Sequence, residues 1–116
     1  MTAQSPDFGV SARQVARAHV VSPRGDLDLS TVAELRSAIR ERPDDCDVLV
    51  LDLRDLTFFD TSGMRLVVET MQELAPLGMR LAIVRGPQQV QRLFALARME
   101  DRLPFFDDLD GALAAT

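Results

Sequence analysis

Residues 48–64 read Val-Leu-Val-Leu-Asp-Leu-Arg-Asp-Leu-Thr-Phe-Phe-Asp-Thr-Ser-Gly-Met, and this stretch decides the fold. Its apolar, β-branched first part predicts a buried central strand over residues 47–53, followed by the short apolar run 56–59. An amphipathic helix is predicted after Gly63, because apolar residues then recur at helical spacing. The core-facing positions of that helix are Met64, Val67, Val68, Met71, Leu74 and Ala75. The polar residues 60–63 therefore lie where the chain enters a helix.

This junction, Asp60-Thr61-Ser62-Gly63, has two interpretations. The N–H groups of a first helical turn have no partner within the helix, so they suit a bound or covalently attached phosphate. Helix capping by Asp, Thr or Ser explains the same residues, is worth about 0.5–2 kcal/mol, and is favoured by the local sequence alone. Gly63 costs about 1 kcal/mol of helix propensity, which close approach of a partner or phosphate to the backbone would explain.

Two strands and a helix are predicted before this stretch. A weak edge strand at residues 8–12 forms a hairpin with a strand over 16–22, which is broken at Pro23. Ser30 or Thr31 can cap the next helix, because Thr31-Val-Ala-Glu34 is a capping-box pattern.

Further strands and helices alternate after it. We expect a strand over residues 79–84 and a helix opened by Gly86-Pro87. A short strand over 103–106 and a short helix over 107–115 complete the chain.

This order of elements predicts the α/β class. We expect one domain over residues 8–116, with a mixed, mainly parallel central sheet of four to five strands and about four helices. Residues 1–7 are expected to form a flexible tail.

The composition excludes several functional classes. The 116 residues carry a net charge of −5, no Trp or Tyr and no basic run, so we expect no nucleic-acid partner and no attraction to anionic membranes. All thirteen cations are arginine, which removes lysine-based catalysis. The single cysteine, Cys46, excludes an internal disulfide and is expected to be buried or half-buried. Because no apolar run could span a membrane and no signal peptide is visible, a cytoplasmic location is expected.

Three polar residues outside the junction could carry chemistry. The only histidine, His19, has no nucleophile nearby in sequence, so we expect a structural or surface role. Asp26 and Asp28 point the same way in an extended segment and could hold a metal or serve phosphoryl transfer. Enzymes that use such a pair also need a lysine, so a polar loop before the helix is favoured.

The side chains flanking the junction are harder to assign. One of Phe58 and Phe59 is expected in the core, which leaves at most one as an exposed anchor. Arg65 lies one turn after Thr61 and opposes the helix dipole. It is expected either to pair with Asp60 or a phosphate, or to be solvated.

Together these motifs resemble the STAS domain family, most closely the bacterial anti-sigma-factor antagonists, over roughly residues 8–115. The segments that carry the resemblance are residues 25–28, 48–53, 56–64 and 91–94. The Asp-Thr-Ser-Gly junction is the most specific of them, and the others support it.

The resemblance implies a binding protein, without enzymatic activity or a cofactor. In the antagonists, an anti-sigma factor that is also an ATP-dependent kinase phosphorylates the hydroxyl residue directly after the junction aspartate. Thr61 occupies that position here, with Ser62 as the alternative. The unphosphorylated form binds the anti-sigma factor and frees the sigma factor. Phosphorylation abolishes that binding, and a metal-dependent phosphatase restores it.

The resemblance also implies a partner-binding surface. The residues that match it are Asp28, Asp60, Thr61, Ser62, Gly63 and Met64. We expect a monomer that exchanges between partners.

Three positions depart from the family pattern. The family often has serine in place of Thr61 and glutamate in place of Asp26, and Pro23 interrupts a position that is usually apolar. Stressosome subunits of the same superfamily also carry phosphorylatable threonines, and single-domain relatives in lipid-transport complexes keep a hydroxyl here for another role. A scaffold subunit of such a complex is therefore the alternative function.

Overall fold

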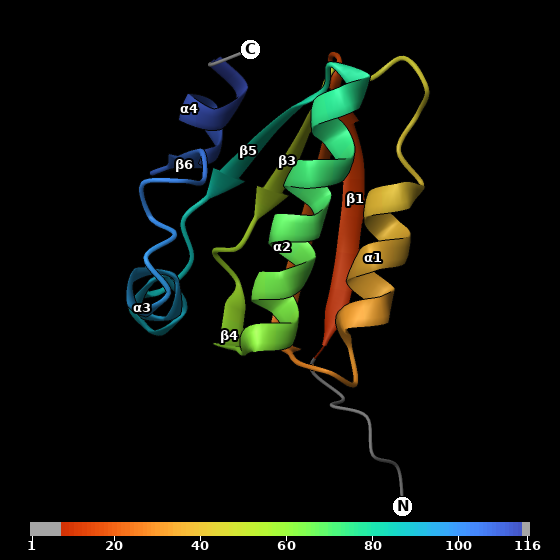
Figure 1. The fold of residues 1–116 in the computed structure, drawn as a ribbon. Helices are drawn as coiled ribbons and strands as arrows, with labels where there is room; N and C mark the ends of the chain where they lie inside the picture. The colour runs from red at the N-terminus through yellow and green to blue at the C-terminus, as the bar shows by residue number, and fades with distance from the viewer. Residues whose placement is uncertain (1–7, 115–116) are drawn as a thin grey trace, which may run out of the picture.

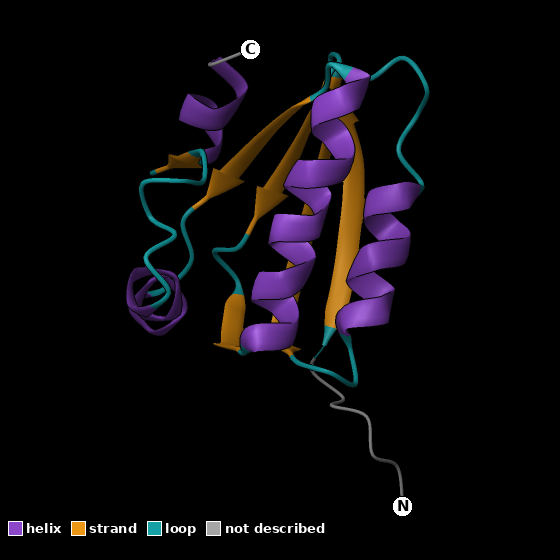
Figure 2. Ribbon diagram, in the orientation of Figure 1, coloured by secondary structure: helices purple, strands orange, loops and turns teal. Residues whose placement is uncertain are grey.

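A computed structural model of the chain describes residues 8–114, in which a six-stranded sheet packs against four α-helices (Figures 1 and 2). The elements in chain order are β1 Gly9–Val15, β2 Ala18–Leu27, α1 Val32–Arg40, β3 Val48–Asp52, β4 Leu56–Phe59, α2 Thr61–Leu74, the 3₁₀ turn η1 Ala75–Leu77, β5 Arg80–Val84, α3 Gln88–Leu96, β6 Phe105–Phe106 and α4 Leu109–Ala114. The predicted α/β class is confirmed. The tail predicted for residues 1–7 lies outside the described residues.

The sheet is mixed but mainly parallel, as predicted. Its order is β1-β2-β3-β5-β6, with β1 antiparallel to β2 and the remaining neighbours parallel. The additional strand β4 pairs with the far half of β2, beyond the point where β3 ends. The sheet therefore has six strands where four to five were predicted, because the short run 56–59 is itself a strand.

Pro23 does not end the second strand, and that prediction was wrong. The strand β2 continues for ten residues, from Ala18 to Leu27. Its ladder with β3 ends at Val21 and its ladder with β4 begins at Gly25, so Pro23 is paired only with Val10 of β1. Proline has no backbone N–H to donate to a neighbouring strand. At residue 23 neither β3 nor β4 is paired with β2, so no such hydrogen bond is lost.

Helices cover the two faces of the sheet unequally. Helices α1 and α2 lie side by side on one face (Figure 1), joined by the ion pairs Arg36–Glu69 and Arg40–Glu73. The larger core lies beneath them and includes Phe94 of α3. On the other face α4 covers a smaller core of β2, β3 and β5 side chains, which includes Val50.

The helix α2 begins at Thr61, three residues earlier than predicted. Its buried positions are Gly63, Leu66, Val67, Thr70 and Leu74, so the buried stripe is rotated from the predicted one. Ala75, predicted to face the core, is exposed in η1. Thr70 is buried without cost in hydrogen bonding because its hydroxyl donates to the Leu66 carbonyl at 2.7 Å.

The parallel strands bring two connections together at one end of the sheet. The chain leaves β2 towards α1 and leaves β4 towards α2 at the lower end of the view in Figure 1. Leu27 pairs with Phe59, and the Asp60 N–H donates to the Leu27 carbonyl at 3.3 Å. The predicted site residues around Asp28 and Asp60 therefore lie next to each other.

Candidate functional site

Asp60 is the N-cap of α2. Its backbone is extended (φ −122°, ψ −170°), and its Oδ1 accepts a hydrogen bond from the Ser62 N–H at 2.8 Å. Its carbonyl accepts from the N–H groups of Gly63 and Met64. The capping interpretation of the junction is thus confirmed, and the aspartate alone performs it.

The hydroxyl residues of the junction differ in exposure. Thr61, the first residue of α2, is exposed, and none of the described residues hydrogen-bonds its side chain. Ser62 is half-buried, and its backbone N–H is engaged by Asp60. Thr61 therefore presents the more accessible hydroxyl, at a helix start where N–H groups point outward.

Gly63 is required by the packing of α2 itself. It is buried, and a Cβ at this position would lie 2.6 Å from Cε1 of Phe59 and 2.8 Å from Cδ2 of Leu27. The helix propensity lost at Gly63 is thus explained by close approach of the first turn to the core. Met64 is half-buried and packs against the same core. Asp60 and Ser62 are also half-buried, so Thr61 is the exposed residue of the junction.

The loop after β2 is built around the Asp28 carboxylate. Its Oδ1 accepts from the Ser30 N–H at 2.9 Å and from the Ser30 hydroxyl at 2.6 Å. The hydrogen bond from the Ser30 hydroxyl, with further ones from the Ser30 and Thr31 backbone and the Thr31 hydroxyl, lowers the pKa of Asp28 below its usual value. Asp28 is therefore ionised at neutral pH.

Thr31 anchors this loop instead of capping α1. Its hydroxyl donates to the Asp26 carbonyl at 2.8 Å and accepts from the Asp28 N–H at 3.0 Å. It makes no side-chain hydrogen bond to the first turn of α1, so the predicted capping box with Glu34 was wrong. The hydroxyl is buried and turned back towards β2, where it has closer partners.

The Asp26 and Asp28 side chains have different hydrogen-bond partners. Asp26 accepts from the Thr57 hydroxyl at 2.8 Å, whereas Asp28 faces Ser30. Among residues 8–114, no group of three or more His, Cys, Asp or Glu side chains is arranged to hold a metal ion. The predicted polar loop before α1 begins only at Asp28, because Asp26 belongs to β2 and pairs with Phe58 of β4.

Two other predicted residues have structural surroundings. His19 is buried, and its Nε2 lies 3.0 Å from the Ala38 carbonyl, which ties β2 to α1. Phe59 is buried against Phe94, and Phe58 is 48% exposed. This confirms the prediction that one of the two phenylalanines lies in the core. Arg65 is exposed and forms no ion pair within the described part of the chain.

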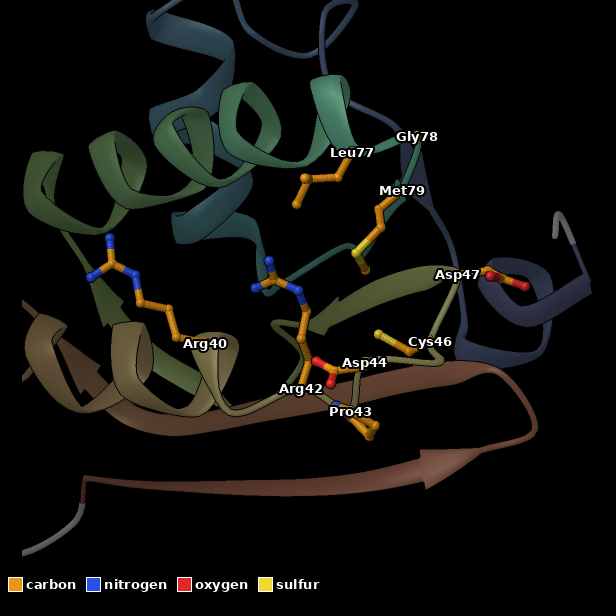
Figure 3. A pocket seen from close by; sticks show the side chains of 9 residues that line it. All are labelled: Arg40, Arg42, Pro43, Asp44, Cys46, Asp47, Leu77, Gly78 and Met79. Atoms are coloured by element: carbon orange, nitrogen blue, oxygen red, sulfur yellow. The ribbon is translucent and has the colours of Figure 1, made fainter.

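A cavity of about 440 Å³ lies at the other end of the sheet, where α1 and η1 end (Figure 3). Its two arginines are engaged, since Arg42 donates to the Ile39 carbonyl and Arg40 pairs with Glu73. Cys46 also lines it and is buried, as predicted, and burial raises the pKa of its thiol. A protonated thiol is a poor nucleophile, so this cavity offers no reactive group from that residue.

One residue of the surface was missed by the sequence analysis. Leu29, between Asp28 and Ser30, is 80% exposed, more than the other large apolar side chains of the described residues. A single leucine in a polar loop belongs to no periodic pattern, so nothing in the sequence distinguishes it from a core residue.

Within residues 8–114, no helix is both long and apolar enough to cross a bilayer.

Comparison with known proteins places the chain in a family. Residues 10–112 match the STAS domain family. An anti-sigma factor antagonist from Mycobacterium paratuberculosis is 28% identical, with a TM-score of 0.84 and alignment over 96% of each chain.

Two structures of the antagonist SpoIIAA share the fold. The unphosphorylated form is 21% identical, with a TM-score of 0.75 over 92% of this chain and 95% of the other. The phosphorylated form, from Bacillus, is 19% identical, with a TM-score of 0.69 over 93% of this chain and 100% of the other.

Proposed function

This chain belongs to the STAS domain family, and on that premise we propose that it is an anti-sigma factor antagonist. In its unphosphorylated form it binds an anti-sigma factor that is also an ATP-dependent kinase, and a sigma factor is released. Phosphorylation of Thr61 by that kinase ends the binding, and a metal-dependent phosphatase restores it. The protein acts as a monomer in the cytoplasm, as a binding partner and not as an enzyme, and needs no cofactor.

The main support for this proposal is that Asp60 caps α2 while the Thr61 side chain does not. Asp60 supplies the capping hydrogen bond, so the hydroxyl of Thr61 is not needed to hold the helix. That hydroxyl is exposed at a helix N-terminus, beside the Asp28 loop. An accessible hydroxyl without a structural task supports modification at this residue. Ser62 is the weaker candidate because it is half-buried.

Phosphorylation of Thr61 should leave the fold intact. A phosphate adds about −1.5 to −2 charge at neutral pH, and a negative charge at a helix N-terminus gains roughly 0.3–1 kcal/mol from the helix dipole. Arg65 lies one helical turn later, is exposed and is free of other ion pairs among residues 8–114. Its guanidinium is within reach of a phosphate on Thr61, because side chains four residues apart lie on one face of a helix.

The same phosphate should weaken partner binding by charge and bulk. It would stand near the carboxylates of Asp60 and Asp28, which already make this surface acidic. A partner carboxylate at about 4 Å would meet repulsion of about 4 kcal/mol per charge at an effective dielectric constant near 20. Since each 1.4 kcal/mol changes affinity about tenfold, a fraction of that repulsion releases the partner.

Phosphopeptide mapping tests the proposed site. The wild-type protein, Thr61→Ala and Ser62→Ala would be incubated with ATP and extract of the native bacterium, and analysed by intact-mass and peptide mass spectrometry. The proposal expects one phosphate on the wild type and on Ser62→Ala, and none on Thr61→Ala. If an extract shown to be active on a control phosphorylates none of the three proteins, the alternative function is favoured. That alternative is a scaffold subunit of a stressosome-like or lipid-transport complex.

A further inference from the structure

The loop between β2 and α1 presents one apolar side chain to solvent. Leu29 is 80% exposed, although leucine is among the residue types most often buried. Its neighbours Asp28 and Ser30 are polar and bond to each other. Leu29 therefore contributes little to the core of this protein, and its side chain is available to a partner.

The backbone on both sides of Leu29 is fixed. Asp28 receives two hydrogen bonds from Ser30 through one carboxylate oxygen. Thr31 bonds to the Asp26 carbonyl and the Asp28 N–H, and its own N–H donates to the Asp28 carbonyl at 3.1 Å. A side chain held on a rigid loop loses less conformational entropy on binding than one on a mobile loop.

We propose that Leu29 is the apolar anchor by which this protein engages its anti-sigma factor, an inference that rests on the proposed function. Leu29 follows the strand end that is hydrogen-bonded to Asp60, so it lies on the same end of the sheet as Thr61. The flanking carboxylates of Asp28 and Asp60 define the chemistry of the partner. The complementary surface is an apolar pocket for Leu29 with uncharged hydrogen-bond donors at its rim for the two carboxylates, so that a phosphate on Thr61 gains no opposite charge there.

Thr61 and Leu29 then have separate tasks. The leucine supplies affinity through buried apolar area, while the threonine decides by its phosphorylation whether the surface can dock. Single exposed apolar residues are common on protein surfaces and need no function of their own. Leu96, at the end of α3, is 75% exposed and serves as the control for an exposed leucine without a function.

The test is a set of binding titrations with purified anti-sigma factors of the source organism, by isothermal calorimetry. The variants are Leu29→Ala, Leu29→Met and the matched control Leu96→Ala. Truncation of a buried anchor leucine should weaken binding about 10- to 100-fold. Leu29→Met should stay within about threefold of the wild type, because methionine fills a similar volume. Leu96→Ala should bind like the wild type, and all variants should keep the wild-type melting temperature.

Each result decides between the two proposals. Wild-type affinity for Leu29→Ala, in a protein that still binds an anti-sigma factor and releases it on Thr61 phosphorylation, would overturn the anchor and leave the antagonist function standing. Equal losses for Leu29→Ala and Leu96→Ala would also overturn it, because the effect would not be specific to this loop. Failure of the wild type to bind any anti-sigma factor would overturn both proposals.

Discussion

Substitution of Gly63 by alanine tests the packing of the junction. A Cβ at this position would lie 2.6 Å from Cε1 and 3.0 Å from Cδ1 of Phe59, and 2.8 Å from Cδ2 of Leu27. Real carbon–carbon contacts in a packed interior are about 3.5–4.0 Å, so either α2 or both side chains must shift. Phe59 also stacks against Phe94 with ring centroids 5.0 Å apart, which limits its movement.

The expected cost follows from two opposing effects. Overpacking of a well-packed core costs about 1–3 kcal/mol. Alanine regains up to about 1 kcal/mol of helix propensity over glycine. The net loss in the free energy of unfolding is therefore about 1 kcal/mol in the middle of these ranges and about 2 kcal/mol at most. Each kcal/mol lowers the melting temperature of a domain of this size by about 4 °C.

Thermal and urea unfolding followed by circular dichroism measure this loss. Gly111→Ala in α4 is the matched control, because its added Cβ would lie 3.1 Å from Oδ1 of the exposed Asp108 and 3.9 Å from Cδ2 of Phe106, which is less crowded than the surroundings of Gly63. We expect Gly111→Ala to be neutral or slightly stabilising. A Gly63→Ala protein as stable as the wild type would refute the close packing of α2 on Phe59 and Leu27.

Other predictions concern the cap, the loop and two strained positions. Asp60→Ala should lose about 1 kcal/mol of stability in urea unfolding, whereas Asp60→Ser should keep most of it, because serine also caps; equal losses would contradict the capping role. Because hydrogen bonds lower the pKa of Asp28, its stabilising contribution is complete above its unfolded pKa of about 4 and disappears as the pH falls through the lower folded value. Urea unfolding between pH 2 and 6 should therefore show a stability advantage of wild type over Asp28→Asn that fades in acid; a constant advantage would argue against this linkage. Ala16 and Arg98 have positive φ angles of 52° and 60°, so Ala16→Gly and Arg98→Gly should each raise stability by about 0.5–1 kcal/mol in thermal unfolding, and a loss would show that these turns are unstrained.

Most of the fold follows from local patterns in the sequence. The run at residues 48–51 is uniformly apolar because β3 is covered on both faces, by the α1–α2 layer and by α4. Helix spacing and the proline and glycine positions predict α1, α2 and α3, although the boundaries shift by a few residues. The prediction failed at Pro23, because the gap between the β3 and β4 ladders is a property of the sheet and not of the strand.

The sequence indicates which residues form the junction before α2, but not the structural role of each. Sequence identifies Asp60, Thr61 and Ser62 as capping candidates without saying which one caps, because each has the required oxygen. Gly63 was interpreted as a point of partner approach, whereas its neighbours Phe59 and Leu27 come from elements that only the fold brings together. Long-range contacts of this kind carry no local signal.

The most direct test of the account is the affinity of the anti-sigma factor for this protein before and after stoichiometric phosphorylation of Thr61, with circular dichroism of both forms. We predict that phosphorylation weakens binding at least tenfold while the far-ultraviolet spectrum stays unchanged, because the switch acts by charge and shape at the surface. Thr61→Ala should keep the affinity of the unphosphorylated protein, and Thr61→Asp should bind more weakly than Thr61→Ala but more tightly than the phosphorylated form. Equal affinity of the phosphorylated and unphosphorylated proteins would contradict the central claim.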